Sequence, residues 1–105
     1  MILKRLYLIG IGLRDIEDLS PDAIDDFHKQ IGSNVKKYRM KKGYSQLQLS
    51  QALNHKSVGL VSQAEIYLKK QHFNLEHLYK IAYILECDIC ELLNVVNLKN
   101  TISKL

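Results

Sequence analysis

The sequence predicts an all-α domain of five short helices between about residues 22 and 97, and two observations support this fold class. Apolar residues recur at three- and four-residue spacing in several consecutive segments, which is the period of an amphipathic helix. Residue types that begin and end helices stand between these segments. With 105 residues, 47% of them hydrophobic and 25% charged, the chain has material for one small core.

The first predicted helix begins after Ser20, because serine is a favoured N-cap and Pro21 suits the first helical position. Gly43, preceded by two lysines, provides its end, with cations at the negative end of the helix dipole. Gly32 lies within the helix and is expected to kink it or to divide it in two. The apolar stripe consists of Ile24, Phe27, Ile31, Val35 and Tyr38.

Caps and apolar spacing predict the other four helices. Ser45 is the expected cap of the second helix, and Ser57, after the polar turn "NHK", is that of the third. Asp88 and Glu91 have the spacing of a capping box for the fifth helix. The residues expected in the core are Leu49, Ala52 and Leu53 in the second helix, Val58, Val61 and Ala64 in the third, Leu75, Leu78, Ala82 and Leu85 in the fourth, and Ile89, Leu92, Leu93 and Val96 in the fifth.

The two ends are predicted as separate regions: an N-terminal extension over residues 1–21 and a C-terminal tail over residues 98–105. Residues 2–9 are rich in apolar side chains and fit a short strand ending at Gly10 and Gly12. A lone strand in a helical domain lacks a partner, so we expect it to pair with its copy in a two-fold homodimer. The tail is either disordered or part of that interface.

Several functional classes are disfavoured. Because no run of 18 apolar residues occurs, we expect a cytoplasmic protein without a membrane partner. No dinucleotide-binding loop, carboxylate pair or Ser/His/Asp set has useful spacing, so we expect neither an enzyme nor a cofactor. Cys87 and Cys90 form a single CxxC without further ligands, which favours a structural role over a redox pair or a metal site.

Charge is divided unevenly along the chain. Residues 1–31 carry four Lys or Arg against six Asp or Glu, a sum of −2, and residues 32–105 carry eleven against five, a sum of +6. Together they give the formal net charge of +4. The basic part suits a polyanionic partner, although ordinary solvated lysines would give the same sum.

Three stretches follow one another in the basic part of the chain, and the resemblance described next depends on their order: "IGSNVKKYRMKKGYSQLQLSQAL", "VSQAE" and "LEHLYKIAYILECDICELL". Over about residues 31–93 the chain resembles the helix-turn-helix DNA-binding domains of the phage-repressor (Cro and XRE-like) type. The resemblance implies a sequence-specific double-stranded DNA-binding transcriptional regulator, a repressor acting as a homodimer, whose third helix enters the major groove. The alternative is an antitoxin-like or phage-type regulator that mainly binds a protein partner through its N-terminal segment.

The resemblance also implies which residues contact DNA. Gln46, in the first turn of the second helix, is expected at a phosphate, and Gln63 is expected to read a base, because its amide can pair bidentately with adenine. Arg39 and Glu65 are expected to form a partly buried ion pair that fixes the angle of the third helix. The other expected contacts are Lys56, Ser57, Val58, Gly59 and Ser62 around the third helix, and Lys36, Lys69 and Lys70 as phosphate clamps.

The chain departs from the family pattern mainly around the third helix. Ser50 and Asn54 stand where the family usually has Ala and Gly, and the turn "NHK" is one residue longer than usual. Tyr67 replaces a common Gly, and "IYLKKQHF" is expected to extend the third helix by a turn. A longer turn shifts the register of the third helix and so changes which of its side chains face the groove. It leaves the predicted fold unchanged.

Overall fold

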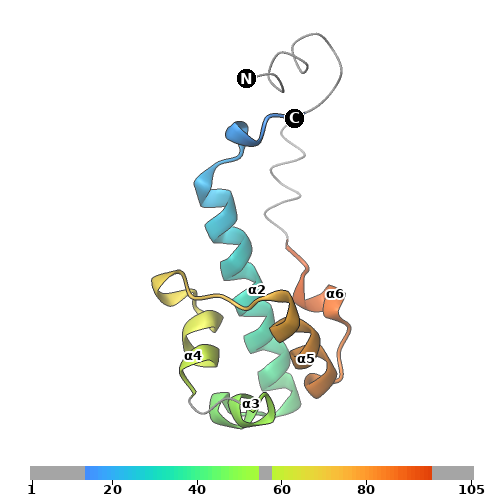
Figure 1. Cartoon of the computed structure of the whole chain (residues 1–105). Coiled ribbons are helices and arrows are strands. Elements are labelled where there is room, and N and C mark those ends of the chain that lie inside the picture. The colour runs from blue at the N-terminus through green and yellow to red at the C-terminus, as the bar shows by residue number, and fades with distance from the viewer. Residues whose placement is uncertain (1–13, 55–57, 96–105) are drawn as a thin grey trace.

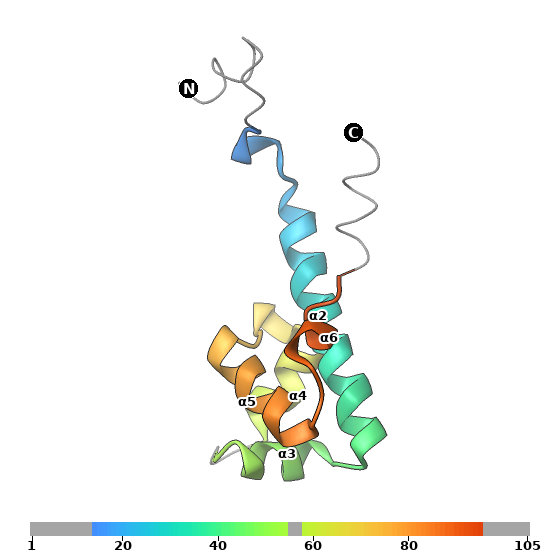
Figure 2. The same ribbon diagram turned by 90° about the vertical axis from the view of Figure 1, so that its right-hand side faces the viewer.

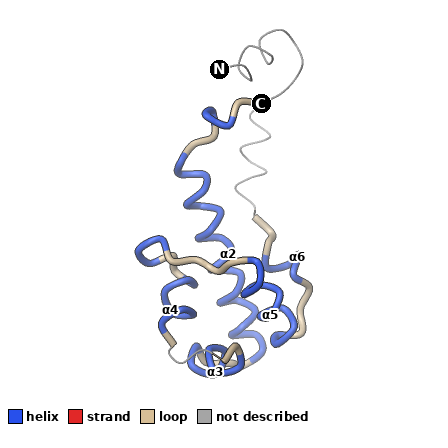
Figure 3. The backbone as a smooth tube through the Cα atoms, in the orientation of Figure 1, coloured by secondary structure: helices blue, strands red, loops and turns tan. Residues whose placement is uncertain are grey.

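Five α-helices make up most of the described chain, residues 14–54 and 58–95 of the computed structural model (Figure 1). They are α2 (Pro21–Lys42), α3 (Gln46–Ala52), α4 (Gly59–Glu65), α5 (Leu75–Leu85) and α6 (Ile89–Leu92), together with the 3-10 turns η2 (Ile16–Asp18) and η3 (Leu68–Lys70). No strand occurs in these residues (Figure 3), so the all-α class is confirmed for them. Equally, none of their helices has the length and apolar character that crossing a membrane requires.

Some predicted features fall outside the described residues. These are the strand at residues 2–9 with its dimer contact, the tail at residues 98–105, and the end of the "NHK" turn with Lys56 and Ser57. The beginning of that turn is described. Asn54 has a φ of 63°, a left-handed conformation that suits glycine and that asparagine tolerates better than most residues.

Helix α2 is the element on which the other helices pack. Ser20 Oγ accepts a hydrogen bond from the Asp22 N–H at 3.1 Å, and Pro21 occupies the first turn, as predicted. Gly43 ends the helix in the left-handed conformation with a φ of 80°, which costs glycine little. The first half of α2 projects from the molecule, and its second half is surrounded by the other helices (Figures 1 and 2).

Gly32 neither kinks nor divides α2, so that expectation was wrong. The helix is continuous from Pro21 to Lys42, and α4 crosses it at Gly32 instead. A Cβ built on Gly32 would collide with the carbonyl oxygen of Ala64 and would lie 2.6 Å from that of Glu65. Backbone atoms cannot move aside as a flexible side chain can, so the close approach of α4 requires glycine at this position.

One hydrophobic core joins all five helices. Asn34 of α2 attaches the end of α6 to this core, because its Nδ2 donates to the carbonyl oxygens of Leu92 at 3.0 Å and Asn94 at 2.9 Å. No local pattern in the sequence indicated this bond between distant segments. The buried apolar residues are Ile31, Val35, Leu49, Leu53, Val61, Ala64, Phe73, Leu78, Ile81, Ala82, Leu85, Leu92 and Val95.

Three predicted core residues are exposed instead. Ile24 lies in the projecting half of α2, beyond the core, and Ala52 lies outside the arc of α3 that buries Leu49, Ser50 and Leu53. Leu75 is 72% exposed, because it begins α5 at the edge of that helix's buried face. A fourth predicted core residue, Val96, is outside the described residues.

The predicted caps of α3 and α6 differ in outcome. Ser45 and Gln48 form a reciprocal capping box, with Ser45 Oγ accepting from the Gln48 N–H at 3.0 Å and Gln48 Oε1 accepting from the Ser45 N–H at 2.8 Å. Asp88 caps α6 through the Cys90 N–H at 2.9 Å. The predicted capping box with Glu91 is therefore wrong, since the Glu91 N–H donates to the backbone oxygen of Asp88.

We predict that Gly32→Ala lowers the free energy of unfolding. Overpacking costs about 1–3 kcal/mol, and the better helix propensity of alanine offsets no more than about 1 kcal/mol. Urea unfolding measures the net loss. Ser33→Ala, at the exposed neighbouring position of the same helix, is the control and should leave stability unchanged or slightly raised. Equal stability of the two variants would show that the approach of α4 is not constrained at Gly32.

Candidate nucleic-acid interface

An ion pair fixes the end of α4 against α2. Arg39 Nε donates to Glu65 Oε2 at 2.6 Å, and the second arm of the guanidinium donates to Glu65 Oε1 at 3.1 Å. The Arg39 side chain is 9% exposed and that of Glu65 is fully buried. A third donor group of Arg39 binds the carbonyl oxygen of Tyr44 at 2.8 Å. The bidentate geometry sets both the position and the orientation of α4.

Gln46 belongs to this buried network. Its Nε2 donates to Glu65 Oε1 at 3.0 Å, so the amide holds α3 and α4 together in addition to any contact outside the molecule. Sequence reasoning placed Gln46 at a phosphate and missed this internal bond, because the two residues are 19 positions apart. The second N–H of the amide and the first turn of α3 are the groups left for a phosphate.

The outer surface of α4 carries the predicted base-contacting residues. Gln63 is exposed, and its neighbour Ile66, which caps the helix end, is 60% exposed. Ser62, Gly59 and Val58 are half-buried, and Ser62 Oγ donates to the Gly59 carbonyl oxygen at 3.2 Å. Of the predicted set on α4, Gln63 is therefore the side chain with the most freedom to reach a ligand.

Helix α4 ends at Glu65, so the predicted extension through "IYLKKQHF" was wrong. Tyr67 has a φ of 56°, which turns the chain out of the helix and into η3. Lys69 and Lys70 also have positive φ values, 53° and 62°. Three left-handed residues without glycine cost roughly 1–2 kcal/mol each, so this turn persists only because other contacts hold it.

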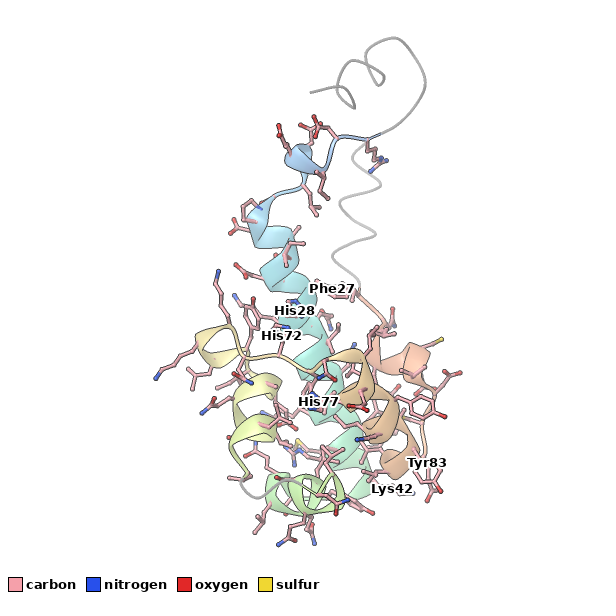
Figure 4. The ribbon with its side chains drawn as sticks, viewed as in Figure 1. Phe27, His28, Lys42, His72, His77 and Tyr83 are labelled. Atoms are coloured by element: carbon pink, nitrogen blue, oxygen red, sulfur yellow. The ribbon has the colours of Figure 1, made fainter. Side chains whose placement is uncertain are left out.

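Those contacts connect the turn to the projecting half of α2. Tyr67 Oη donates to Asp25 Oδ1 at 2.8 Å, and Lys70 Nζ lies 4.0 Å from the same oxygen. The rings of His28 and His72 stack with their centroids 4.0 Å apart (Figure 4). The Tyr67 ring also stacks with that of His28, at 5.5 Å. We call these four residues, Asp25, His28, Tyr67 and His72, the latch.

His28 is uncharged in the latch. Burial lowers the pKa of His28 below its ordinary value, the neighbouring His72 lowers it further, and Asp25 opposes both effects. His28 Nδ1 is buried and has no hydrogen-bond partner among the described residues, so a proton there would gain no acceptor. The hydrogen bond to the Asp25 carboxylate raises the pKa of Tyr67 above its ordinary value.

The lysines predicted as phosphate clamps flank α4. Lys36 lies on α2 between Gly32 and Arg39, on the side that contacts α4, and is exposed. Lys69 and Lys70 are exposed on the turn that follows α4. The structure thus brings Lys36, which is more than thirty positions earlier in the sequence, to the same helix as the adjacent Lys69 and Lys70.

Acidic residues are almost missing from this part of the chain. Residues 32–75 contain eight Lys or Arg and one acid, Glu65, which is 3% exposed and paired with Arg39. The remaining acids after residue 31 are Glu76, Glu86, Asp88 and Glu91, on or beside α5 and α6. The exposed charged residues described in this stretch are therefore all basic, and two of them have acidic partners outside it: Lys42 pairs with Glu86 at 3.2 Å, and Lys70 lies 4.0 Å from Asp25.

The cysteines lie elsewhere and have no feature of a reactive pair. A hollow of about 380 Å³ between the end of α2 and the α5–α6 connection includes Cys87 in its wall. Both thiols are free, and burial raises the pKa of Cys87, whereas the Asp88 carboxylate raises that of Cys90. Protonated thiols are poor nucleophiles. Within the described residues, no group of three or more His, Cys, Asp or Glu could hold a metal ion.

We predict that Glu65→Leu lowers the free energy of unfolding by about 3–5 kcal/mol, because it leaves the Arg39 charge buried without a partner. Arg39→Met combined with Glu65→Leu removes both charges and should recover a large part of that loss. Chemical unfolding of the two single variants and the double variant forms the test. A double variant that loses as much as the two single variants together would show that the residues do not act as a pair.

We predict that the folded protein loses stability as the pH falls below about 6.5. The unfolded chain has the ordinary histidine pKa of 6.5 and the folded protein a lower one for His28, so the unfolded state binds this proton first and acid favours it. His28→Phe keeps an aromatic ring in the stack and removes the titration, so its stability should fall less over the same range. Urea unfolding against pH measures the difference, and a His28 pKa at or above 6.5 by NMR titration would contradict it.

Comparison with known proteins adds no family name to this geometry. No family model matches the chain, and no curated protein or solved structure matches it either.

Proposed function

We propose that the chain is a sequence-specific double-stranded DNA-binding regulator of transcription, a repressor that acts as a homodimer. In this proposal α3 and α4 are the helix-turn-helix pair, and α4 enters the major groove. Gln63 reads a base edge, and Lys36, Lys69 and Lys70 contact phosphates on either side of the groove.

The observation that carries the proposal is the near-absence of acids from residues 32–75, the stretch that contains α3 and α4. The one acid in residues 32–75 is Glu65, and its charge is neutralised inside the molecule by Arg39 at 2.6 Å. A surface with several exposed lysines and no opposing carboxylate from its own stretch attracts a polyanion. Lys70 also lies 4.0 Å from Asp25 of α2, so this carboxylate competes with a phosphate at that lysine.

The rigid attachment of α4 supports recognition of sequence in addition to attraction to phosphate. Reading a base edge requires that a side chain arrive at a defined place, and each good bidentate contact is worth about 1–3 kcal/mol of discrimination. Gly32 sets the distance between α4 and α2, and the Arg39–Glu65 pair sets the angle. The exposed Gln63 is therefore presented from a helix whose position is fixed before binding.

Selection from a random pool of double-stranded DNA tests sequence recognition. We expect the protein to enrich a palindromic motif, because a two-fold dimer presents α4 to two half-sites. Gln63→Ala should change the preferred base at symmetry-related positions. Enrichment of no motif, or an identical motif from Gln63→Ala, would contradict the proposed readout.

A salt titration tests the phosphate contacts. We predict that Lys69→Ala or Lys70→Ala weakens binding to all sequences alike and reduces the slope of log affinity against log salt by about one. Lys41→Ala is the matched control. Lys41 is exposed near the end of α2, with its Nζ 5.5 Å from the centre of the Tyr38 ring, and lies outside the proposed DNA and dimer interfaces. Equal effects of the three substitutions would indicate attraction by net charge alone.

A further inference from the structure

We propose that the exposed face of α5 formed by Leu75, Tyr79 and Tyr83 is the surface through which two copies of the chain dimerise. This inference rests on the proposed function for its role in DNA binding, but the dimer itself is expected without DNA. The sequence predicted a dimer contact at residues 2–9, and the face proposed here belongs to a different element.

The α5 face is apolar and open to solvent. Leu75, Tyr79 and Tyr83 follow one another at four-residue spacing, so they lie along one side of the helix. They are 72%, 70% and 82% exposed. Their helix buries Leu78, Ile81, Ala82 and Leu85 on an adjoining face. Tyrosine is enriched among the residues that dominate binding energy at protein interfaces, and a continuous exposed apolar stripe is a common sign of such an interface.

The order of the side chains favours a second copy as the occupant. If two α5 helices cross in antiparallel orientation about a two-fold axis at Tyr79, the two Tyr79 rings meet at the axis. Leu75 of each copy then faces Tyr83 of the other, because both are four positions from Tyr79. The surface is thus complementary to itself, as an interface with two-fold symmetry requires.

The charges beside the stripe fit the same arrangement. Glu76 and Lys80 form an ion pair at 3.9 Å within the helix, and in the antiparallel dimer Lys80 of one copy comes near Glu76 of the other. At the end of α5, Lys42 and Glu86 pair at 3.2 Å. These four charges sum to zero, so two chains with a formal net charge of +4 each can meet here without local repulsion.

The position of α5 leaves the proposed DNA-binding helix available. In Figures 1 and 4, α4 and α5 lie on opposite sides of the molecule, and Tyr83 lies near Lys42 at the far end of α5 from the latch. Both surfaces can therefore be occupied at once. Three side chains on one eleven-residue helix make a small interface, so we expect a reversible dimer that dissociates on dilution.

Sedimentation of the full chain without DNA tests the interface. The wild-type protein should change from monomer to dimer as its concentration rises. Tyr79→Glu places two carboxylates at the axis and should weaken the dimer at least about tenfold, which is about 1.4 kcal/mol. Met40→Glu introduces the same charge at another exposed apolar residue, which is 61% exposed, and should leave the dimer unchanged. Circular dichroism verifies that both variants fold.

A charge exchange identifies the partner as a second copy. Glu76→Lys and Lys80→Glu should each weaken self-association, because each brings like charges together across the axis. A mixture of the two variants should associate more strongly than either alone, since opposite charges then face each other. A monomeric wild-type protein, a dimer insensitive to Tyr79→Glu, or a mixture no stronger than its components would overturn the proposal. A dimer with these properties that selects no DNA motif would instead overturn the proposed function.

Discussion

The attachment of α4 to α2 is the constraint on which the candidate site depends. A steric constraint and an ion pair act together where α4 crosses α2. The missing side chain of Gly32 lets the backbones approach until a Cβ would lie 2.6 Å from the Glu65 carbonyl oxygen. At that distance the Glu65 carboxylate reaches Arg39 in bidentate geometry. Close approach and ion pairing require each other, because a wider spacing would leave both charges buried without a partner.

This network also explains why a seven-residue helix can have a fixed direction. Helices as short as α4 are not stable alone in water, and α4 has no side-chain cap at its N-cap, Val58. Its order comes from Val61 and Ala64 in the core and from Glu65, which is bonded to both α2 and α3. The outer face, including Gln63, is therefore not needed to hold the helix in place.

In the turn after α4, side-chain contacts offset an unfavourable backbone conformation. Its left-handed residues cost free energy, and the latch of Asp25, His28, Tyr67 and His72 offsets that cost by contacts with the projecting half of α2. The lysines of the turn are consequently placed by residues far earlier in the chain, as the separation of 42 positions between Asp25 and Tyr67 shows. Burial lowers the pKa of His28, so the uncharged ring is the form that takes part in this placement.

Local signals in the sequence were sufficient to predict the ends of several helices. Ser20 with Pro21, Gly43, and Ser45 act on neighbouring backbone groups, so the boundaries of α2 and the beginning of α3 follow from the residues themselves. Periodicity likewise identified most of the core. The role of Gly32, the end of α4 at Glu65, the engagement of Gln46 and the exposure of Leu75 emerged only from the packed chain. Each of these depends on a partner distant in the sequence or on the packing of a whole helix face, and local spacing contains no information about either.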